Sequence, residues 1–256
     1  MTDYIAIAAA AARAAGQILR DGWGKPHAIE FKGATNLVTE VDRAAEAIII
    51  EQLTRATPDF DILAEESGAQ ARGSAFRWVI DPVDGTTNYA HHFPYFAVSI
   101  GLEENGASIA GVVYDPILDQ LFTATRGGGA WLNGAKISSS HAQTIGESVL
   151  ATGLIYETWE SDRGLDEITR MIKHARSIRI NGSAALDLAN VACGRLDAYC
   201  DTGLYAWDIS AGRLLVTEAG GAFKQYGAAT RADLTYCIGA NAFLGAELER
   251  LLIVAR

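Results

Sequence analysis

The spacing of apolar residues along the chain changes from helical to strand-like and then alternates between the two. The alanine-rich residues 3–22 predict a closely packed helix, and residues 39–57 carry apolar side chains at helical spacing. Between residues 96 and 125, short apolar runs are separated by Asn-Gly and Asp-Pro pairs, which predicts consecutive strands joined by turns. After residue 141, strand-like and helix-like segments alternate, as is typical of an α/β arrangement.

This change of pattern predicts two lobes with a boundary at Ser138 to His141. Residues 1–140 are expected to form an N-terminal α+β lobe, and residues 141–256 a C-terminal α/β lobe. A chain of 256 residues is long enough to bury a large core, so we expect the two lobes to form a single compact unit.

Composition and charge exclude several classes of function. The chain is 49% hydrophobic and 20% charged, which is typical of a globular protein, and its net charge is −10. Without a surplus of basic residues it lacks the charge that a general nucleic-acid binder needs, so we expect no nucleic-acid partner. No apolar run approaches the length that crosses a bilayer, so no membrane partner is expected either.

The cysteines and the N-terminal residues indicate the compartment. Three cysteines without a Cys-x-x-Cys spacing leave an odd thiol, which makes a disulfide framework improbable. The first apolar run has Asp3 at its head and no basic region before it, unlike a signal peptide. A cytoplasmic location is therefore the default expectation.

One apolar segment is followed directly by acidic and turn-forming residues. Residues 78–80 are predicted to end a buried strand, and Asp81 is expected where the strand stops, because Pro82 cannot donate to a sheet ladder. Asp84-Gly85 supplies turn chemistry, and residues 86–88 suit the start of a helix. Carboxylates at this place could hold Mg²⁺, and amide N–H groups could hold a phosphate.

This stretch has three other interpretations. Asp, Pro and Gly also make up an ordinary turn after a strand, and the stretch alone leaves that alternative open. A calcium loop of the helix-loop-helix type needs an oxygen ligand at its third position, where this chain has Val83. Phosphatases with an aspartyl nucleophile place two aspartates two residues apart, whereas Asp81 and Asp84 are three apart. The spacing therefore favours attack by a metal-activated water.

Acidic residues stand at the ends of predicted elements in three further places. Glu65 follows a short apolar strand, Asp42 lies in the first turn of a predicted helix, and Asp208 opens another helix. For Glu65 alone, a solvated charged turn is the simpler interpretation. The adjacent His91 and His92 would point to opposite faces of a strand, so both are left outside the predicted metal site.

The order of these motifs resembles the inositol monophosphatase family of metal-dependent sugar phosphatases. Residues 65–67 resemble the acidic strand end of that family, residues 81–88 its signature loop, and residues 207–212 its C-terminal signature. The resemblance covers nearly the whole chain. It implies an α/β fold layered as an α-β-α-β-α sandwich, with the active site between the lobes.

The resemblance also implies two to three Mg²⁺ ions. Glu65, Asp81 and the backbone carbonyl of Val83 would bind the first ion, and Asp81, Asp84 and Asp208 the second. A third, weaker ion would also depend on Glu65. Magnesium suits such a site because it prefers oxygen ligands and retains water molecules.

Catalytic and substrate-binding roles follow from the same resemblance. Thr86 paired with Asp42, with Glu65 nearby, would activate the attacking water, and the backbone amides of Gly85 and Thr86 would hold the phosphate. The other implied substrate-binding residues are Ala184, Asp201 and Lys32. Asp187 could belong to the same rim, cap a helix or satisfy a buried polar group.

The predicted reaction is Mg²⁺-dependent hydrolysis of a phosphate monoester of a small polyol. The leading candidate is myo-inositol 1-phosphate, with histidinol phosphate, fructose 1,6-bisphosphate and a nucleotide 3′-phosphate as alternatives. A regulatory partner of the transcription machinery is an alternative of another class. The resemblance further implies a homodimer and inhibition by lithium.

Overall fold

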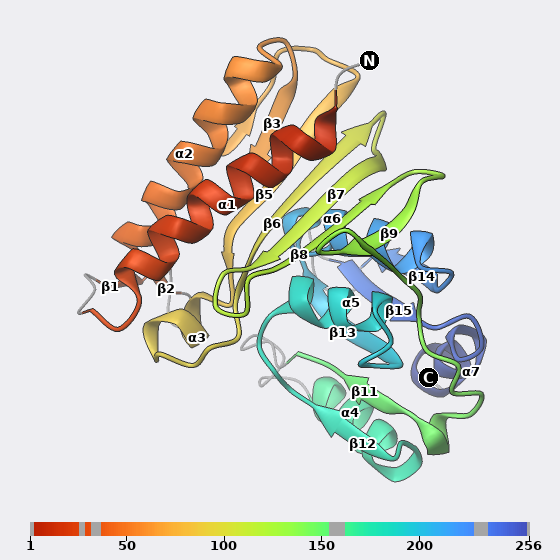
Figure 1. The fold of residues 1–256 in the computed structure, drawn as a ribbon. Coiled ribbons are helices and arrows are strands. Elements are labelled where there is room, and N and C mark those ends of the chain that lie inside the picture. The colour runs from red at the N-terminus through yellow and green to blue at the C-terminus, as the bar shows by residue number, and fades with distance from the viewer. Residues whose placement is uncertain (1–2, 26–28, 32–36, 154–161, 228–234, 255–256) are drawn as a thin grey trace.

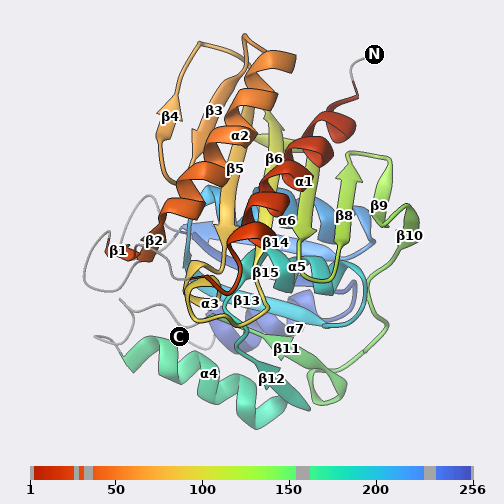
Figure 2. The same ribbon diagram turned by 60° about the vertical axis from the view of Figure 1, so that its left-hand side comes forward.

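The computed structural model describes residues 3–25, 29–31, 37–153, 162–227 and 235–254. Helices and sheets alternate in it as five layers, α-β-α-β-α, which confirms the predicted fold class (Figure 1). Two helices cover one face of an eight-stranded sheet, two more lie between that sheet and a five-stranded one, and the last helices cover the far face (Figure 2).

The first helical layer consists of α1 (Tyr4–Gly22) and α2 (Glu40–Ala56). Asp3 caps α1 by accepting a hydrogen bond from the amide of Ala6. The buried face of α1 consists largely of alanines, so the helix lies close to the sheet. A Cβ on Gly16 would come within 2.4 Å of the ring of Tyr114, which explains the glycine there.

The eight-stranded sheet is antiparallel except where β3 pairs with β5. Asn105 and Gly106 both have positive φ angles and join two central strands, as the Asn-Gly pair predicted. Across the sheet, the strands are β10 (Ala135–Ile137), β9 (Gly129–Leu132), β8 (Gln120–Thr125), β7 (Ala107–Asp115), β6 (Ala97–Glu104), β5 (Phe76–Asp84), β3 (Asp61–Ala64) and β4 (Gly68–Gln70).

Strand β5 continues further than the sequence predicted. Its pairing with β6 is regular from Phe76 to Asp81, shifts register there, and resumes where Asp84 faces Ala97. The irregularity accommodates Pro82, which has no N–H to donate. The prediction that the strand stops at Asp81 was therefore wrong, and Asp81 and Asp84 both belong to the end of a sheet strand.

The second sheet and its helices come from the later part of the chain. In order across the sheet, the strands are β12 (Ser177–Arg179), β11 (Val149–Ala151), β13 (Ala198–Leu204), β15 (Thr235–Ala240) and β14 (Ala222–Gly227). The helices are α5 (Ala184–Ala192) and α6 (Ala206–Glu218) between the sheets, and α4 (Asp162–His174) and α7 (Gly245–Glu249) outside. The smaller elements are β1 (Ile29–Phe31), β2 (Leu37–Thr39), α3 (Thr86–Ala90), a 3-10 turn (Ile145–Glu147) and a π-helical turn (Arg250–Val254).

Three hydrophobic clusters hold the layers together. On β13, Ala198 and Cys200 face the outer cluster, whereas Tyr199 and Leu204 face the cluster around α5 and α6. Because α6 packs against both sheets, the ends of β5, α5 and α6 meet. The division into lobes at residues 140 and 141 stays a prediction.

The described residues bear on two expectations, one about the cysteines and one about membrane-spanning helices. Cys193, Cys200 and Cys237 are all free thiols, in agreement with the expectation that a disulfide framework is improbable. No helix in the described part of the chain is both long enough and apolar enough to cross a membrane.

Candidate active site

Three aspartates predicted as metal ligands lie together at the junction of the two sheets. Asp81 and Asp84 come from the end of β5, and Asp208 comes from the first turn of α6. Each offers one carboxylate oxygen, and these oxygens all lie within 4.8 Å of one another. Asp81 and Asp84 are buried and Asp208 is half-buried. The tertiary structure thus brings together residues from distant parts of the sequence.

The electrostatics of this cluster favour a cation. Burial raises the pKa of Asp81 and of Asp208, and the neighbouring carboxylates raise both further. Burial also raises the pKa of Asp84 to about 6, against the opposing effect of its hydrogen bonds. Mutual repulsion of this kind is relieved when a divalent cation binds between the carboxylates.

Hydrogen bonds from the chain orient each of these carboxylates. Asp84 Oδ2 accepts hydrogen bonds from Ser183 Oγ at 2.5 Å and from the amide of Ala185 at 2.6 Å. The amide of Val83 donates to Asp81 at 3.0 Å, and the amide of Tyr205 donates to Asp208 at 2.7 Å. Such contacts set ligand geometry before an ion binds.

Glu65 lies beside this cluster but is not part of the closely spaced group of three. Its amide donates to the carbonyl of Ile80 at 3.2 Å, which places the turn after β3 next to β5. Its charge raises the pKa of both Asp81 and Asp208, so it faces the same space. The predicted role of Glu65 as a ligand stays a prediction.

Thr86 and Asp42, which the sequence predicted to pair, are in contact. Thr86 Oγ1 lies 3.1 Å from Asp42 Oδ1 and 3.0 Å from the carbonyl oxygen of Val83. Asp42 is fully buried on α2. The structure therefore joins the first helical layer to the loop after β5, and the catalytic role of the pair remains a prediction.

Gly85 makes the sharp turn between Asp84 and α3. Its φ of +100° lies in the region that favours glycine, and it caps the short helix that begins at Thr86. A Cβ here would lie 3.0 Å from the carbonyl oxygen of Tyr95 and 3.1 Å from that of Gly182. A side chain would thus strain the backbone and crowd this turn.

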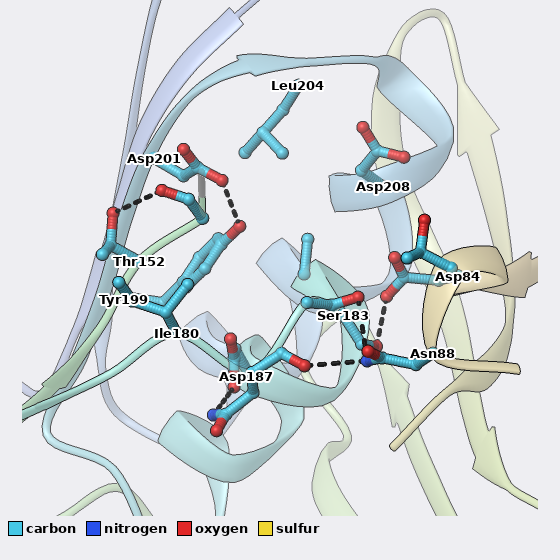
Figure 3. A pocket seen from close by; sticks show the side chains of 15 residues that line it. Asp84, Asn88, Thr152, Ile180, Ser183, Asp187, Tyr199, Asp201, Leu204 and Asp208 are labelled. Carbon is cyan, nitrogen blue, oxygen red and sulfur yellow. Dashed lines mark hydrogen bonds between the residues drawn. The ribbon is translucent and has the colours of Figure 1, made fainter. Parts of the chain in front are cut away.

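A cavity of about 350 Å³ opens beside the carboxylate cluster. Figure 3 shows Asp84 and Asp208 on one side of it, Tyr199 and Asp201 on the other, and Asp187 below Tyr199. The segment from residue 180 to residue 184, which leads into α5, forms another part of its lining. Ala184 is part of that lining, as is Asp201, so two predicted substrate-binding residues face this space.

Asp201 is buried and held by its neighbours. Tyr199 Oη donates to Asp201 Oδ2, and the amide of Thr202 donates to Oδ1, both at 2.7 Å. Burial raises the pKa of Asp201 to about 7. A Cβ on Gly153 would stand 2.0 Å from Asp201 Oδ2, so only glycine leaves room for the carboxylate in this position.

Asp187, whose role the sequence left open, lies on the cavity wall. Its side chain is 1% exposed, and Oδ1 accepts hydrogen bonds from Tyr95 Oη at 2.6 Å and Asn181 Nδ2 at 2.7 Å. Burial raises the pKa of Asp187 to about 7. The cap of α5 is Ser183, which accepts from the amide of Leu186, so the helix-capping alternative for Asp187 was wrong.

The structure adds one residue that sequence reasoning missed. Asn88 Nδ2 donates to the carbonyl oxygens of Tyr95, at 2.7 Å, and Asn181, at 2.8 Å, and so ties α3 to the segment before α5. Nothing in a single sequence indicates this bridge, because its partners are backbone groups distant in sequence. His91 and His92 are exposed and follow α3, and neither belongs to the group of close carboxylates in the described residues. Lys32 lies outside the described residues.

Comparison with known proteins identifies the family of this chain. The model of the inositol monophosphatase family matches residues 1–252. The chain belongs to the inositol monophosphatase family. As a family member it is a phosphoric monoester hydrolase.

Relatives of this chain include proteins named inositol monophosphatase and proteins named SuhB. An inositol monophosphatase of Dictyostelium discoideum is 43% identical over 212 residues, covering 80% of this chain and 77% of the relative. The Nus factor SuhB of Escherichia coli is 42% identical over 230 residues, covering 88% and 86%. The crystal structure of the extragenic suppressor protein SuhB from Bartonella henselae has a TM-score of 0.89 at 38% identity, covering 97% of each chain.

Proposed function

We propose that this protein is a Mg²⁺-dependent phosphatase that hydrolyses the phosphate monoester of a small polyol, with myo-inositol 1-phosphate as the leading candidate. The observation that carries the proposal is the group formed by Asp81, Asp84 and Asp208, which opens onto a cavity of about 350 Å³. Relatives that are named inositol monophosphatase support the choice of substrate.

The residues at the cluster fit Mg²⁺. Burial raises the pKa of all three carboxylates, and neighbouring carboxylates raise the pKa of Asp81 and Asp208 further. These groups supply the hard oxygen ligands that this ion prefers. With Glu65 and the carbonyl of Val83 as further ligands, the proposed set would hold two to three ions, as the family resemblance implies. When bound, Mg²⁺ would act as a Lewis acid toward the phosphate and lower the pKa of a water molecule.

The chain's own residues would supply binding, orientation and proton transfer. The amides of Gly85 and Thr86, at the start of α3, would hold the phosphate. The Thr86 hydroxyl, which lies between Asp42 and the Val83 carbonyl, would orient the attacking water, with Asp42 accepting the proton and Glu65 assisting. The attack on phosphorus would be in line with the leaving alcohol.

The alcohol part of the substrate would occupy the rest of the cavity. Asp201 and the backbone of Ala184 line that space and can contact hydroxyl groups. Lys32, which lies outside the described residues, is proposed to contribute as the family resemblance implies. Hydroxyl recognition here would separate sugar and polyol phosphates from phosphate esters with apolar alcohols.

The test is phosphate release from a panel of substrates, with and without Mg²⁺. The panel contains inositol 1-phosphate, histidinol phosphate, fructose 1,6-bisphosphate, adenosine 2′-monophosphate and a 3′,5′-bisphosphate nucleotide. An Asp84→Asn variant is the control. Turnover that requires Mg²⁺ and is lost in the variant supports the mechanism, and the preferred compound identifies the substrate. Absence of turnover on the whole panel, with Mg²⁺ bound, would sink the proposal for these substrates.

A second candidate function is a regulatory contact with the transcription machinery. The Escherichia coli relative is named a Nus factor, and this name is the observation that favours the alternative. The experiment is co-purification with RNA polymerase, using the wild type and the Asp84→Asn variant. Binding that persists in the inactive variant would separate this role from catalysis, and failure to co-purify would reject it.

Three further properties are proposals of the same kind. We expect a homodimer, inhibition by lithium and a cytoplasmic location, and the free thiols agree with a reducing compartment. Sedimentation velocity tests the first and assay in lithium chloride the second. Fractionation of cells from the source organism tests the third.

A further inference from the structure

Two buried carboxylates of the cavity lie outside the predicted metal site. Asp187 is 1% exposed and Asp201 is 6% exposed, and both line the cavity. We call this pair the acidic wall. Figure 3 shows it across the cavity from Asp208, where the leaving alcohol of a substrate held at the metal cluster would lie.

The hydrogen bonds of Asp187 all end on one of its oxygens. Tyr95 Oη and Asn181 Nδ2 both donate to Oδ1, and within the described part of the chain no hydrogen bond ends on Oδ2. A buried carboxylate oxygen gains most from a donor, because burial without one is costly. The cavity is the place from which a ligand can provide that donor.

The charge of the cavity limits what can fill it. Among the described residues that line the cavity, none is lysine, arginine or histidine. Four are acidic: Asp84, Asp187, Asp201 and Asp208. Ions at the cluster would be held by Asp84 and Asp208, whereas Asp187 and Asp201 are not in the proposed ligand set. A second phosphate on the substrate would be repelled there by the negative carboxylates of Asp187 and Asp201. A hydroxyl or an ammonium group would instead donate hydrogen bonds to these carboxylates.

We propose that Asp187 is a specificity-determining residue, which with Asp201 selects leaving alcohols that donate hydrogen bonds and rejects substrates with a second phosphate. The selected class comprises polyol and amino-alcohol monophosphates. This inference rests on the proposed phosphatase function and narrows its substrates, since it excludes bisphosphates as preferred substrates.

A purely structural role for Asp187 has a different consequence. If its carboxylate only held Tyr95 and Asn181 in place, its replacement would change the turnover of every substrate by a similar factor. Asparagine is the informative replacement, because its amide oxygen can still accept from both partners while the charge is lost.

The experiment compares kcat/KM for four substrates in the wild type, in Asp187→Asn and in a matched control variant. The assay is run at about pH 8, because Asp187, with a pKa of about 7, is then ionised. The substrates are inositol 1-phosphate, histidinol phosphate, fructose 1,6-bisphosphate and p-nitrophenyl phosphate, whose leaving group is without hydroxyl donors. The control is Asp115→Asn, which makes the same change at a buried aspartate that binds the amides of Ile117 and Leu118, outside the cavity lining.

In Asp187→Asn, we expect the kcat/KM ratio of inositol 1-phosphate to fructose 1,6-bisphosphate to fall about tenfold, chiefly through KM. Asp115→Asn should leave that ratio unchanged. A larger loss with histidinol phosphate than with inositol 1-phosphate would show that Asp187 reads an ammonium group, and the reverse would show that it reads hydroxyls.

Two results would overturn the proposal: an unchanged ratio in Asp187→Asn, or a wild type that prefers fructose 1,6-bisphosphate. Failure of the proposed function is a separate result. In that case the wild type would release no phosphate in a Mg²⁺-dependent way from any substrate, including p-nitrophenyl phosphate, and the inference on Asp187 would fall with it.

Discussion

Asp84 and Ser183 are joined by a hydrogen bond of 2.5 Å, although 99 positions separate them in the sequence. The serine hydroxyl also accepts from the amide of Leu186 and so caps α5. One side chain therefore fixes both the start of a helix and the orientation of a predicted metal ligand. The end of β5 and the start of α5 are coupled through this contact.

Replacing Ser183 with alanine should affect stability and metal binding together. Loss of the cap should cost about 1 kcal/mol of unfolding free energy. Loss of the bond to Asp84 should weaken Mg²⁺ binding by about tenfold or more, as for other contacts that orient ligands. Thermal unfolding and a Mg²⁺ titration measure the two effects. Ser183→Thr keeps a hydroxyl and should retain most of both, and unchanged Mg²⁺ affinity in the alanine variant would contradict the coupling.

Magnesium should stabilise the protein against heat. At a hundredfold excess over its Kd, a ligand that binds only the folded state adds about 3 kcal/mol, or roughly 5–10 °C for a chain of this size. Asp84→Asn should lose most of this shift. The metal-free variant should be at least as stable as the wild type, because a buried charge that repels Asp81 and Asp208 is gone. Differential scanning calorimetry with Mg²⁺ or EDTA measures both. A Mg²⁺ shift that survives in the variant would exclude Asp84 as a ligand.

The hydroxyl of Thr86 should matter for the rate rather than for the fold. Thr86→Val removes the contacts with Asp42 and with the carbonyl of Val83 but keeps the shape. We expect kcat to fall about a hundredfold or more, the usual size of a lost proton-transfer contribution. Thr86→Ser should keep most of the activity. Similar kcat values for the valine and serine variants would argue against a catalytic hydroxyl.

Gly153 should be irreplaceable because of its contact with Asp201. The methyl group of alanine would stand 2.0 Å from Asp201 Oδ2 and must displace it. Gly153→Ala should raise KM for inositol 1-phosphate by about tenfold and cost about 1–3 kcal/mol of stability. Gly227→Ala, where a Cβ meets open space, is the matched control and should change neither quantity. Equal KM values in the two variants would refute the assignment.

The stability of the metal-free protein should depend on pH through Asp187. Its pKa is raised to about 7 by burial, which outweighs the hydrogen bonds from Tyr95 and Asn181, and the charges of Asp84 and Asp201 add to the rise. The folded state then binds a proton that the unfolded state has lost between about pH 4 and pH 7, so stability falls as pH rises through that window. Asp187→Asn should show a shallower fall, measured as Tm at about pH 5.5 and pH 8 in EDTA. Parallel curves for the two proteins would contradict the shifted pKa.

The sequence predicted strands whose apolar runs are bounded by turn residues or acidic residues, including the short strand β3. It missed β4, β9 and β10, which are three or four residues long and bury few of their residues. Such strands form because a neighbouring strand offers hydrogen-bond partners. Their own residues do not alternate between apolar and polar over a long enough stretch to be recognised as a strand from the sequence. The course of β5 beyond Asp81 was missed for a similar reason, since its register shift depends on pairing with β6.

The sequence by itself determined the local features of this protein and the order of its acidic motifs. The cap at Asp3, the Asn105-Gly106 turn and the acids near element ends depend on residues close together in the chain, and local sterics and hydrogen bonding decide them. Family resemblance then gave their chemical meaning. Only the tertiary structure decided that Asp208 meets Asp81 and Asp84, because α6 must pack between the two sheets to bury its apolar residues.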